Sequence, residues 1–133
     1  MHCNSDSRTT NKLAVPNAQL LADDYARNGF KVVVPDIFPD AAPGDALEPG
    51  VINVTFDFGQ WLGRNGAHVT EPVVRKVVAA LREQGVKRFG ALGYCYGARV
   101  VFNLAFDNEL DVIVVSHPSL LQVPVDFEVR TCA

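Results

Sequence analysis

Cysteine is scarce in this 133-residue chain, which contains Cys3, Cys95 and Cys132 and no others. The number is odd, and the spacing fits neither a disulfide framework nor a zinc site. No stretch approaches the roughly 20 consecutive apolar residues that a membrane helix needs, and residues 1–7 lack the apolar core of a signal peptide. We therefore expect a cytoplasmic protein with no metal and no membrane partner.

An excess of basic residues is also missing, since 12 Lys and Arg stand against 15 Asp and Glu. Nucleic-acid-binding proteins usually concentrate positive charge on one surface, so the composition argues against such a partner. The chain has neither a G-x-G-x-x-G nor a Walker pattern, and we expect no cofactor. A solvated outer face best explains the densest basic group, which is Arg75, Lys76, Arg82, Lys87 and Arg88.

With 48% apolar and 20% charged residues, the composition is that of a soluble globular domain. Apolar periodicity predicts helices over 16–29 and 70–85, the second with Thr70 as N-cap, and a third after Gly97 through Ala98, Val101, Phe102 and Ala105. Continuous apolar runs predict strands at 31–35, 88–93 and 112–116. The excursion between residues 36 and 69 has one short helical stretch near 56–61. Residues 1–13 read as a polar tail, 14–121 as the domain and 122–133 as an irregular C-terminal tail.

The predicted elements alternate between helix and strand along the chain. Such an order favours an α/β fold with a mostly parallel sheet and helices on both faces. In a sheet of this kind, the carboxyl ends of the strands lie at one edge, and the turns that follow them carry the functional residues.

The pentapeptide Gly93-Tyr94-Cys95-Tyr96-Gly97 has the pattern of a nucleophile elbow between a strand and a helix. Glycines at both flanks suit such a tight turn, and Cys95 takes the position of the attacking residue. The N-terminus of the following helix favours the thiolate, and the Tyr96 N–H is a candidate oxyanion donor. The alternative is a structural cysteine buried in a glycine-rich turn.

These residues resemble the dienelactone hydrolases, especially fungal members of wider carboxylesterase type. The resemblance covers residues 13–123 and is strongest in the stretches L-A-V-P-N-A-Q-L-L-A-D-D-Y-A, V-V-V-P-D-I-F-P, G-Y-C-Y-G and S-H-P-S. It implies a partial α/β-hydrolase fold and a cysteine nucleophile that cleaves ester or lactone bonds of small molecules. We expect a form shortened at both ends, because residues 1–12 are too polar to form the strand that the family places between those at 31–35 and 88–93.

Family members complete the site with an aspartate and a histidine well downstream of the elbow. Here the only histidine after Cys95 is His117, and Asp107, Asp111 and Asp126 stand in other contexts. Because His117 follows a predicted strand, it should lie at the same sheet edge as Cys95. Three roles are open for it there: it lines the substrate pocket, it is structural, or it replaces the missing base. Tyr94 and Trp61 are further candidates for the pocket.

Two non-hydrolytic interpretations remain open at this stage. The chain could be an inactive truncated homologue that binds a ligand or a protein partner, or Cys95 could sense redox changes if its thiol is exposed and acidic. The sequence does not indicate an oligomeric state.

Overall fold

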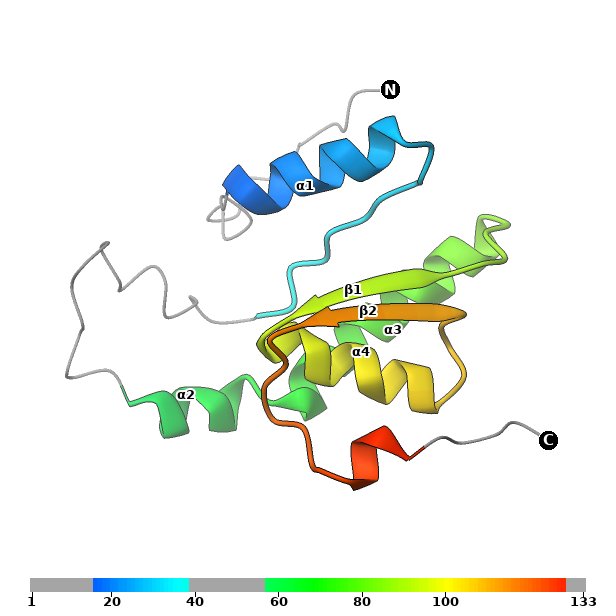
Figure 1. Ribbon diagram of the computed structural model, residues 1–133. Helices are drawn as coiled ribbons and strands as arrows, with labels where there is room; N and C mark the ends of the chain where they lie inside the picture. The colour runs from blue at the N-terminus through cyan, green and yellow to red at the C-terminus, as the bar shows by residue number, and fades with distance from the viewer. Residues whose placement is uncertain (1–15, 39–56, 129–133) are drawn as a thin grey trace. The chain divides into compact units, whose positions relative to one another are not determined.

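The computed structural model describes residues 16–38 and 57–128. The chain divides into two units, Met1–Asp57 and Phe58–Ala133, each considered by itself. The first contains helix α1 (Pro16–Arg27) (Figure 1). The elements of the second are α2 (Phe58–Arg64), α3 (Ala67–Glu83), β1 (Gly90–Tyr94), α4 (Tyr96–Phe106), β2 (Val112–Ser116) and a 3-10 turn (Val125–Phe127).

Helix α1 confirms the helix predicted from Pro16, and Gly29 ends it as expected. Gly29 has a φ of 91° and donates to Ala26 O, while Phe30 N–H donates to Tyr25 O at 3.3 Å. This is a Schellman motif, and the Tyr25 and Phe30 rings make the apolar contact that usually accompanies it, with their centroids 6.0 Å apart. The helix end is thus fixed by residues adjacent in sequence.

The predicted strand at 31–35 is wrong, because residues 31–38 have no regular secondary structure. Val33 and Val34 are 46% and 42% exposed, whereas a strand inside a parallel sheet would bury both. A β-branched run becomes a strand only when a neighbouring strand pairs with its backbone. Among the described residues, the sheet consists of β1 and β2 alone, so none pairs with this segment.

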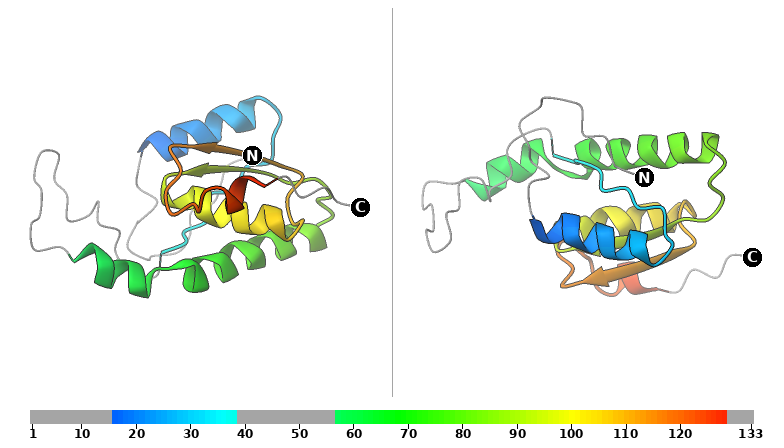
Figure 2. Two further views of the ribbon diagram at one scale, coloured as in Figure 1. Left: turned by 60° about the horizontal axis from the view of Figure 1, so that its bottom comes forward. Right: turned by 90° about the horizontal axis from the view of Figure 1, so that it is seen from above.

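Strands β1 and β2 form a parallel pair with Gly90 opposite Val112 and Tyr94 opposite Ser116. The predicted strand at 112–116 is confirmed, and the one predicted at 88–93 begins two residues later and ends one residue later. Helix α4 connects the two strands and lies along one face of the pair (Figure 2). On the other face the side chains are exposed and mostly apolar: Leu92, Tyr94, Val112 and Val114.

The buried face of α4 differs in part from the predicted stripe. Ala98 and Val101 are buried as expected, and they are joined by Val100 and Leu104. Phe102 instead turns toward the 3-10 turn, where its ring centroid lies 5.8 Å from that of Phe127. A helix between a sheet and a second helix buries more than one stripe, and its own periodicity does not indicate this.

Helix α3 begins earlier than predicted, at Ala67, and Gly66 is its N-cap. Thr70 is therefore not the N-cap but a fully buried residue in the first turn, and Pro72 lies within the helix. Val78 of α3 packs against Val100 and Leu104 of α4. This small core is completed by partly buried neighbours, which are Val74, Phe89, Tyr96 and Leu110.

Two members of the basic group, Arg75 and Arg82 on α3, pair with acidic residues. The other members are exposed as expected: Lys76, Lys87 and Arg88. Arg75 binds Asp107 at 2.5 Å and Glu109 at 2.7 Å, and Arg82 binds Glu109 at 3.3 Å. The hydrogen bonds that Arg75 donates, first that to Asp107 and then that to Glu109, raise the pKa of Arg75. The ion pairs link α3 to the segment between α4 and β2.

No sequence pattern indicated the 3-10 turn near the C-terminus, in a stretch expected to be irregular. Asp126 in this turn is 8% exposed and accepts hydrogen bonds from Arg99 Nη1 and from Gln122 N–H, each at 2.5 Å. Arg99 also donates to Asn103 Oδ1 on α4 at 2.9 Å. The ion pair therefore anchors the turn to α4.

Acidification is expected to weaken this anchor. The hydrogen bond from Arg99, and then that from Gln122, lowers the pKa of Asp126 below its ordinary value. The stability that ionised Asp126 contributes to the folded state is therefore complete above the unfolded-state pKa of about 3.9. It disappears as pH falls through the lower folded-state pKa. Asp126→Asn should have a lower Tm than the parent chain at pH 7, and the difference between the two Tm values should disappear below about pH 4. Parallel Tm curves across that range would contradict the assignment.

Candidate active site

Cys95 lies between the last residue of β1 and the first residue of α4, with a φ of 48° and a ψ of −113°. A positive φ is uncommon outside glycine and persists only where neighbouring groups fix it. Cys95 N–H donates to Ser116 O at 3.2 Å, and Cys95 O accepts from Ser119 N–H at 3.1 Å. The sharp strand-to-helix turn predicted for residues 93–97 is therefore present, with the cysteine at its apex.

The two flanking glycines have different roles in the turn. A Cβ on Gly93 would lie 2.7 Å from Ala98 Cα and 2.9 Å from both Ala98 N and Gly97 O, so no side chain fits there. A Cβ on Gly97 would meet no atom within 4 Å among the described residues. The steric reason that predicted glycine at both positions thus applies to Gly93 and not to Gly97.

The Cys95 thiol is exposed, which does not fit a cysteine buried in a glycine-rich turn. It precedes the 11-residue helix α4, whose first turn contains no acidic residue. Tyr96 is the first residue of that helix. N–H groups of a first turn point out past the helix start, and the helix dipole favours negative charge there.

The side chain of Tyr96 ties the start of α4 to the neighbouring helices. Its hydroxyl donates to Asn65 O at 2.7 Å and lies 3.1 Å from Thr70 Oγ1. Trp61 packs edge-on against the Tyr96 ring with centroids 6.5 Å apart, and it is only 5% exposed. Trp61 therefore lies behind the elbow as support for Tyr96.

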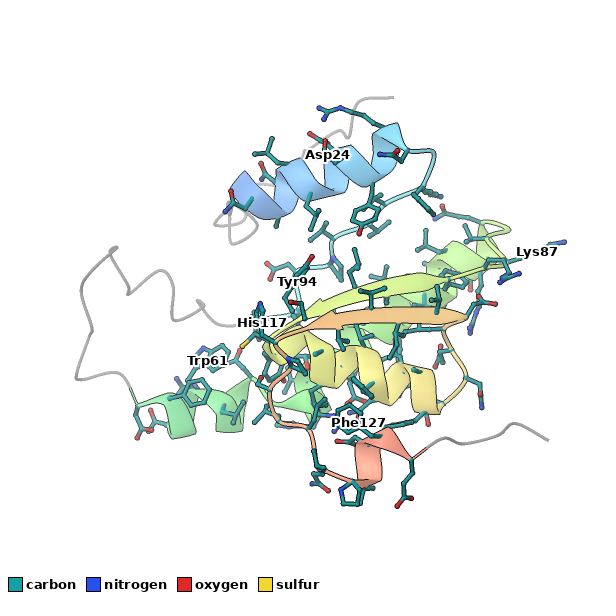
Figure 3. All side chains as sticks on the ribbon, viewed as in Figure 1. Asp24, Trp61, Lys87, Tyr94, His117 and Phe127 are labelled. Atoms are coloured by element: carbon teal, nitrogen blue, oxygen red, sulfur yellow. The ribbon has the colours of Figure 1, made fainter. Side chains whose placement is uncertain are left out.

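Tyr94 and His117 lie side by side where the two strands end (Figure 3). Their ring centroids are 5.9 Å apart, and both side chains are exposed. His117 follows Ser116, the register partner of Tyr94, so the parallel pairing brings it to the edge that carries Cys95. Among the described residues, no hydrogen bond joins His117 to Cys95.

The three downstream aspartates are engaged away from this edge. Asp107 binds Arg75, and Asp126 binds Arg99. Asp111 accepts from Phe89 N–H at 2.7 Å, next to the first residues of the sheet. None of the three is bonded to His117.

Ser119 is a site residue that sequence reasoning missed. The Cys95 thiol donates a hydrogen bond to Ser119 Oγ, with the sulfur and oxygen 3.8 Å apart. Two signals were available: the Ser116-His117-Pro118-Ser119 stretch resembles the family, and it comes directly after an apolar run.

Within residues 16–38 and 57–128, no three His, Cys, Asp or Glu side chains gather as metal ligands. No helix of the same residues is long and apolar enough to cross a membrane.

Comparisons with known proteins show which family this chain is similar to. Residues 11–130 match the profile of the dienelactone hydrolase family. Hydrolase pyvD of Aspergillus violaceofuscus is 36% identical over 83% of this chain and 43% of its own length. Hydrolase tropI of Talaromyces stipitatus is 35% identical over 77% of this chain and 42% of its own length.

A carboxymethylenebutenolidase homolog of Mus musculus is 35% identical over 65% of this chain and 34% of its own length. No solved structure matches the chain significantly. The chain spans less than half the length of these curated relatives. The family match covers nearly all of this chain, however, and includes both the elbow and the stretch after β2. The chain therefore belongs to the dienelactone hydrolase family, whose fold is that of the α/β-hydrolases.

Proposed function

We propose that this chain hydrolyses ester or lactone bonds of small molecules in the cytoplasm, with Cys95 as the nucleophile. The observation that carries the proposal is the exposed Cys95 thiol at the apex of a strand-to-helix turn, in a backbone conformation with a φ of 48°. A structural cysteine would need neither the exposure nor the unusual backbone. The family and its named hydrolases support the reaction class.

In the proposed reaction, the thiolate of Cys95 attacks the carbonyl carbon of the substrate and forms a C–S bond. The carbonyl oxygen becomes an oxyanion, which the Tyr96 N–H at the start of α4 stabilises. Collapse of this intermediate breaks the C–O bond and expels the alkoxide, which takes a proton from water, and an acyl thioester is left on Cys95. Water then attacks the thioester and loses a proton to the solvent, and the C–S bond breaks to release the carboxylic acid and restore the Cys95 thiolate. The thiol proton passes to water, because no described base is bonded to Cys95.

Tyr94 and His117 are the side chains proposed to contact the substrate. Both are exposed beside Cys95 at the end of the strand pair, and their rings offer apolar faces with polar tips. Trp61 is buried behind Tyr96 and would act on the pocket indirectly, by packing against Tyr96 and fixing the start of α4.

The test is to trap the acyl thioester. The purified chain is mixed with p-nitrophenyl acetate, quenched in acid within seconds and digested, and the Cys95 peptide is weighed by mass spectrometry. We expect an acetyl group on Cys95 that hydroxylamine removes, and none on Cys3 or Cys132. A folded chain that carries no acetyl group on Cys95 would instead favour a ligand-binding or partner-binding module that lacks this chemistry.

A further inference from the structure

The end of β2 and the residues that follow it form hydrogen bonds with both the backbone N–H and the backbone C=O of Cys95. Ser116 O accepts from Cys95 N–H at 3.2 Å, and Ser119 N–H donates to Cys95 O at 3.1 Å. We name residues 116–120 the clamp loop. Because both polar backbone groups of the cysteine are bonded to one loop, the position of the thiol depends on that loop as well as on α4.

The clamp loop is itself held in an unusual conformation. His117 has a φ of 38° and Leu120 a φ of 61°, and neither is a glycine. Residues of this kind keep a positive φ only when their surroundings determine it. One such constraint is Arg99 of α4, whose Nη1 reaches Leu120 O at 3.5 Å while binding Asp126 at 2.5 Å. The loop that holds Cys95 is thus tied back to the helix that begins beside it.

Within this loop, the hydroxyl of Ser119 lies next to the thiol. Cys95 Sγ and Ser119 Oγ are 3.8 Å apart, with the thiol as donor. A hydroxyl accepts one hydrogen bond and donates another, so it can rotate to donate to the sulfur once the thiol has lost its proton. Ser119 is half-buried, whereas Cys95 is exposed.

We propose that Ser119 is a positioning residue for Cys95, which orients the thiol through its hydroxyl and stabilises the thiolate by donating a hydrogen bond to it. The inference rests on the proposed role of Cys95 as nucleophile, but it is tested through the reactivity of the thiol rather than through turnover. Hydrogen bonds to a charged partner are stronger than those to a neutral one, which is the basis for a measurable effect of a single hydroxyl.

The experiment measures the alkylation rate of Cys95 by iodoacetamide at pH 7 in the parent chain and three variants. Ser119→Ala and Ser119→Gly remove the hydroxyl and keep the N–H bond to Cys95 O, while Ser119→Thr keeps both. We expect alkylation to slow about threefold to tenfold in the Ala and Gly variants. The Thr variant should react at close to the parent rate. Peptide mass spectrometry follows each cysteine separately, and Cys3 and Cys132 serve as internal references with unchanged rates.

Equal Cys95 rates in all four proteins would overturn the proposal. Loss of the folded state in both the Ala and Gly variants, seen by circular dichroism, would overturn it as well, because Ser119 would then be structural. If only one of them folds, that variant decides the matter. Slower alkylation in the hydroxyl-free variants together with no acetyl adduct on the parent Cys95 would retain the positioning role and reject the proposed hydrolysis. An acetyl adduct on the parent Cys95 together with equal alkylation rates would retain the proposed hydrolysis and reject the positioning role of Ser119.

Discussion

Replacing Cys95 by alanine is expected to slow the release of p-nitrophenol from p-nitrophenyl acetate by about a hundredfold or more, the low end of what removing a nucleophile costs an enzyme. The low end applies because, in the described site, no base is bonded to the thiol. The remaining rate should equal that of buffer and of surface amines. Steady-state absorbance measurements over a range of ester concentrations give both kcat and KM.

Two further variants make this result specific to Cys95. Cys132→Ala removes another thiol and should release p-nitrophenol at the parent rate. Cys95→Ser keeps the shape of the elbow but offers a hydroxyl that is hardly ionised at neutral pH, so most of the rate should be lost here too. Release that is equally fast in the parent and in Cys95→Ala would assign the hydrolysis to another group and refute the nucleophile.

Replacing Gly93 by alanine is expected to destabilise the folded state by about 1–3 kcal/mol. The new Cβ would lie 2.7 Å from Ala98 Cα and 2.9 Å from Gly97 O. These are backbone atoms of α4, so relief requires the helix to move away from β1 rather than a side chain to rotate. Thermal and urea unfolding followed by circular dichroism measure the loss.

Gly97→Ala provides the matched control for this change. The same methyl group would meet no described atom within 4 Å, and alanine is favoured over glycine in helices by up to about 1 kcal/mol. We expect a Tm equal to or slightly above that of the parent. An equal loss of stability in the two variants would show that the turn tolerates a side chain at neither position. This would contradict the steric difference between Gly93 and Gly97.

The sequence was informative where the cause of a structure lies in adjacent residues. Gly29 and Gly85 end their helices because each takes a positive φ that few other residues adopt. The elbow was predictable for the same reason, since it needs a glycine two positions before the cysteine and a helix directly after it. The strand at 112–116 was also found, because it is a continuous β-branched run.

The sequence was not informative where the cause lies in distant residues. Residues 31–35 have the composition of a strand, but a strand also needs a paired neighbour, which no local pattern supplies. Ser119 contacts a thiol 24 positions earlier in the chain, and the burial of Asp126 depends on Arg99, 27 positions away. The polar tail predicted at residues 1–13 lies outside the described residues.

Arg99 has a consequence for how mutational scans of this protein are read. It binds Asp126 and reaches the carbonyl of Leu120, and Leu120 ends the loop that holds Cys95. A screen that scores only product formation would therefore group Arg99 and Asp126 with the nucleophile, although neither touches sulfur. Scoring protein abundance in the same library would separate the two classes. Only substitutions of the supporting residues would lower both product formation and protein abundance.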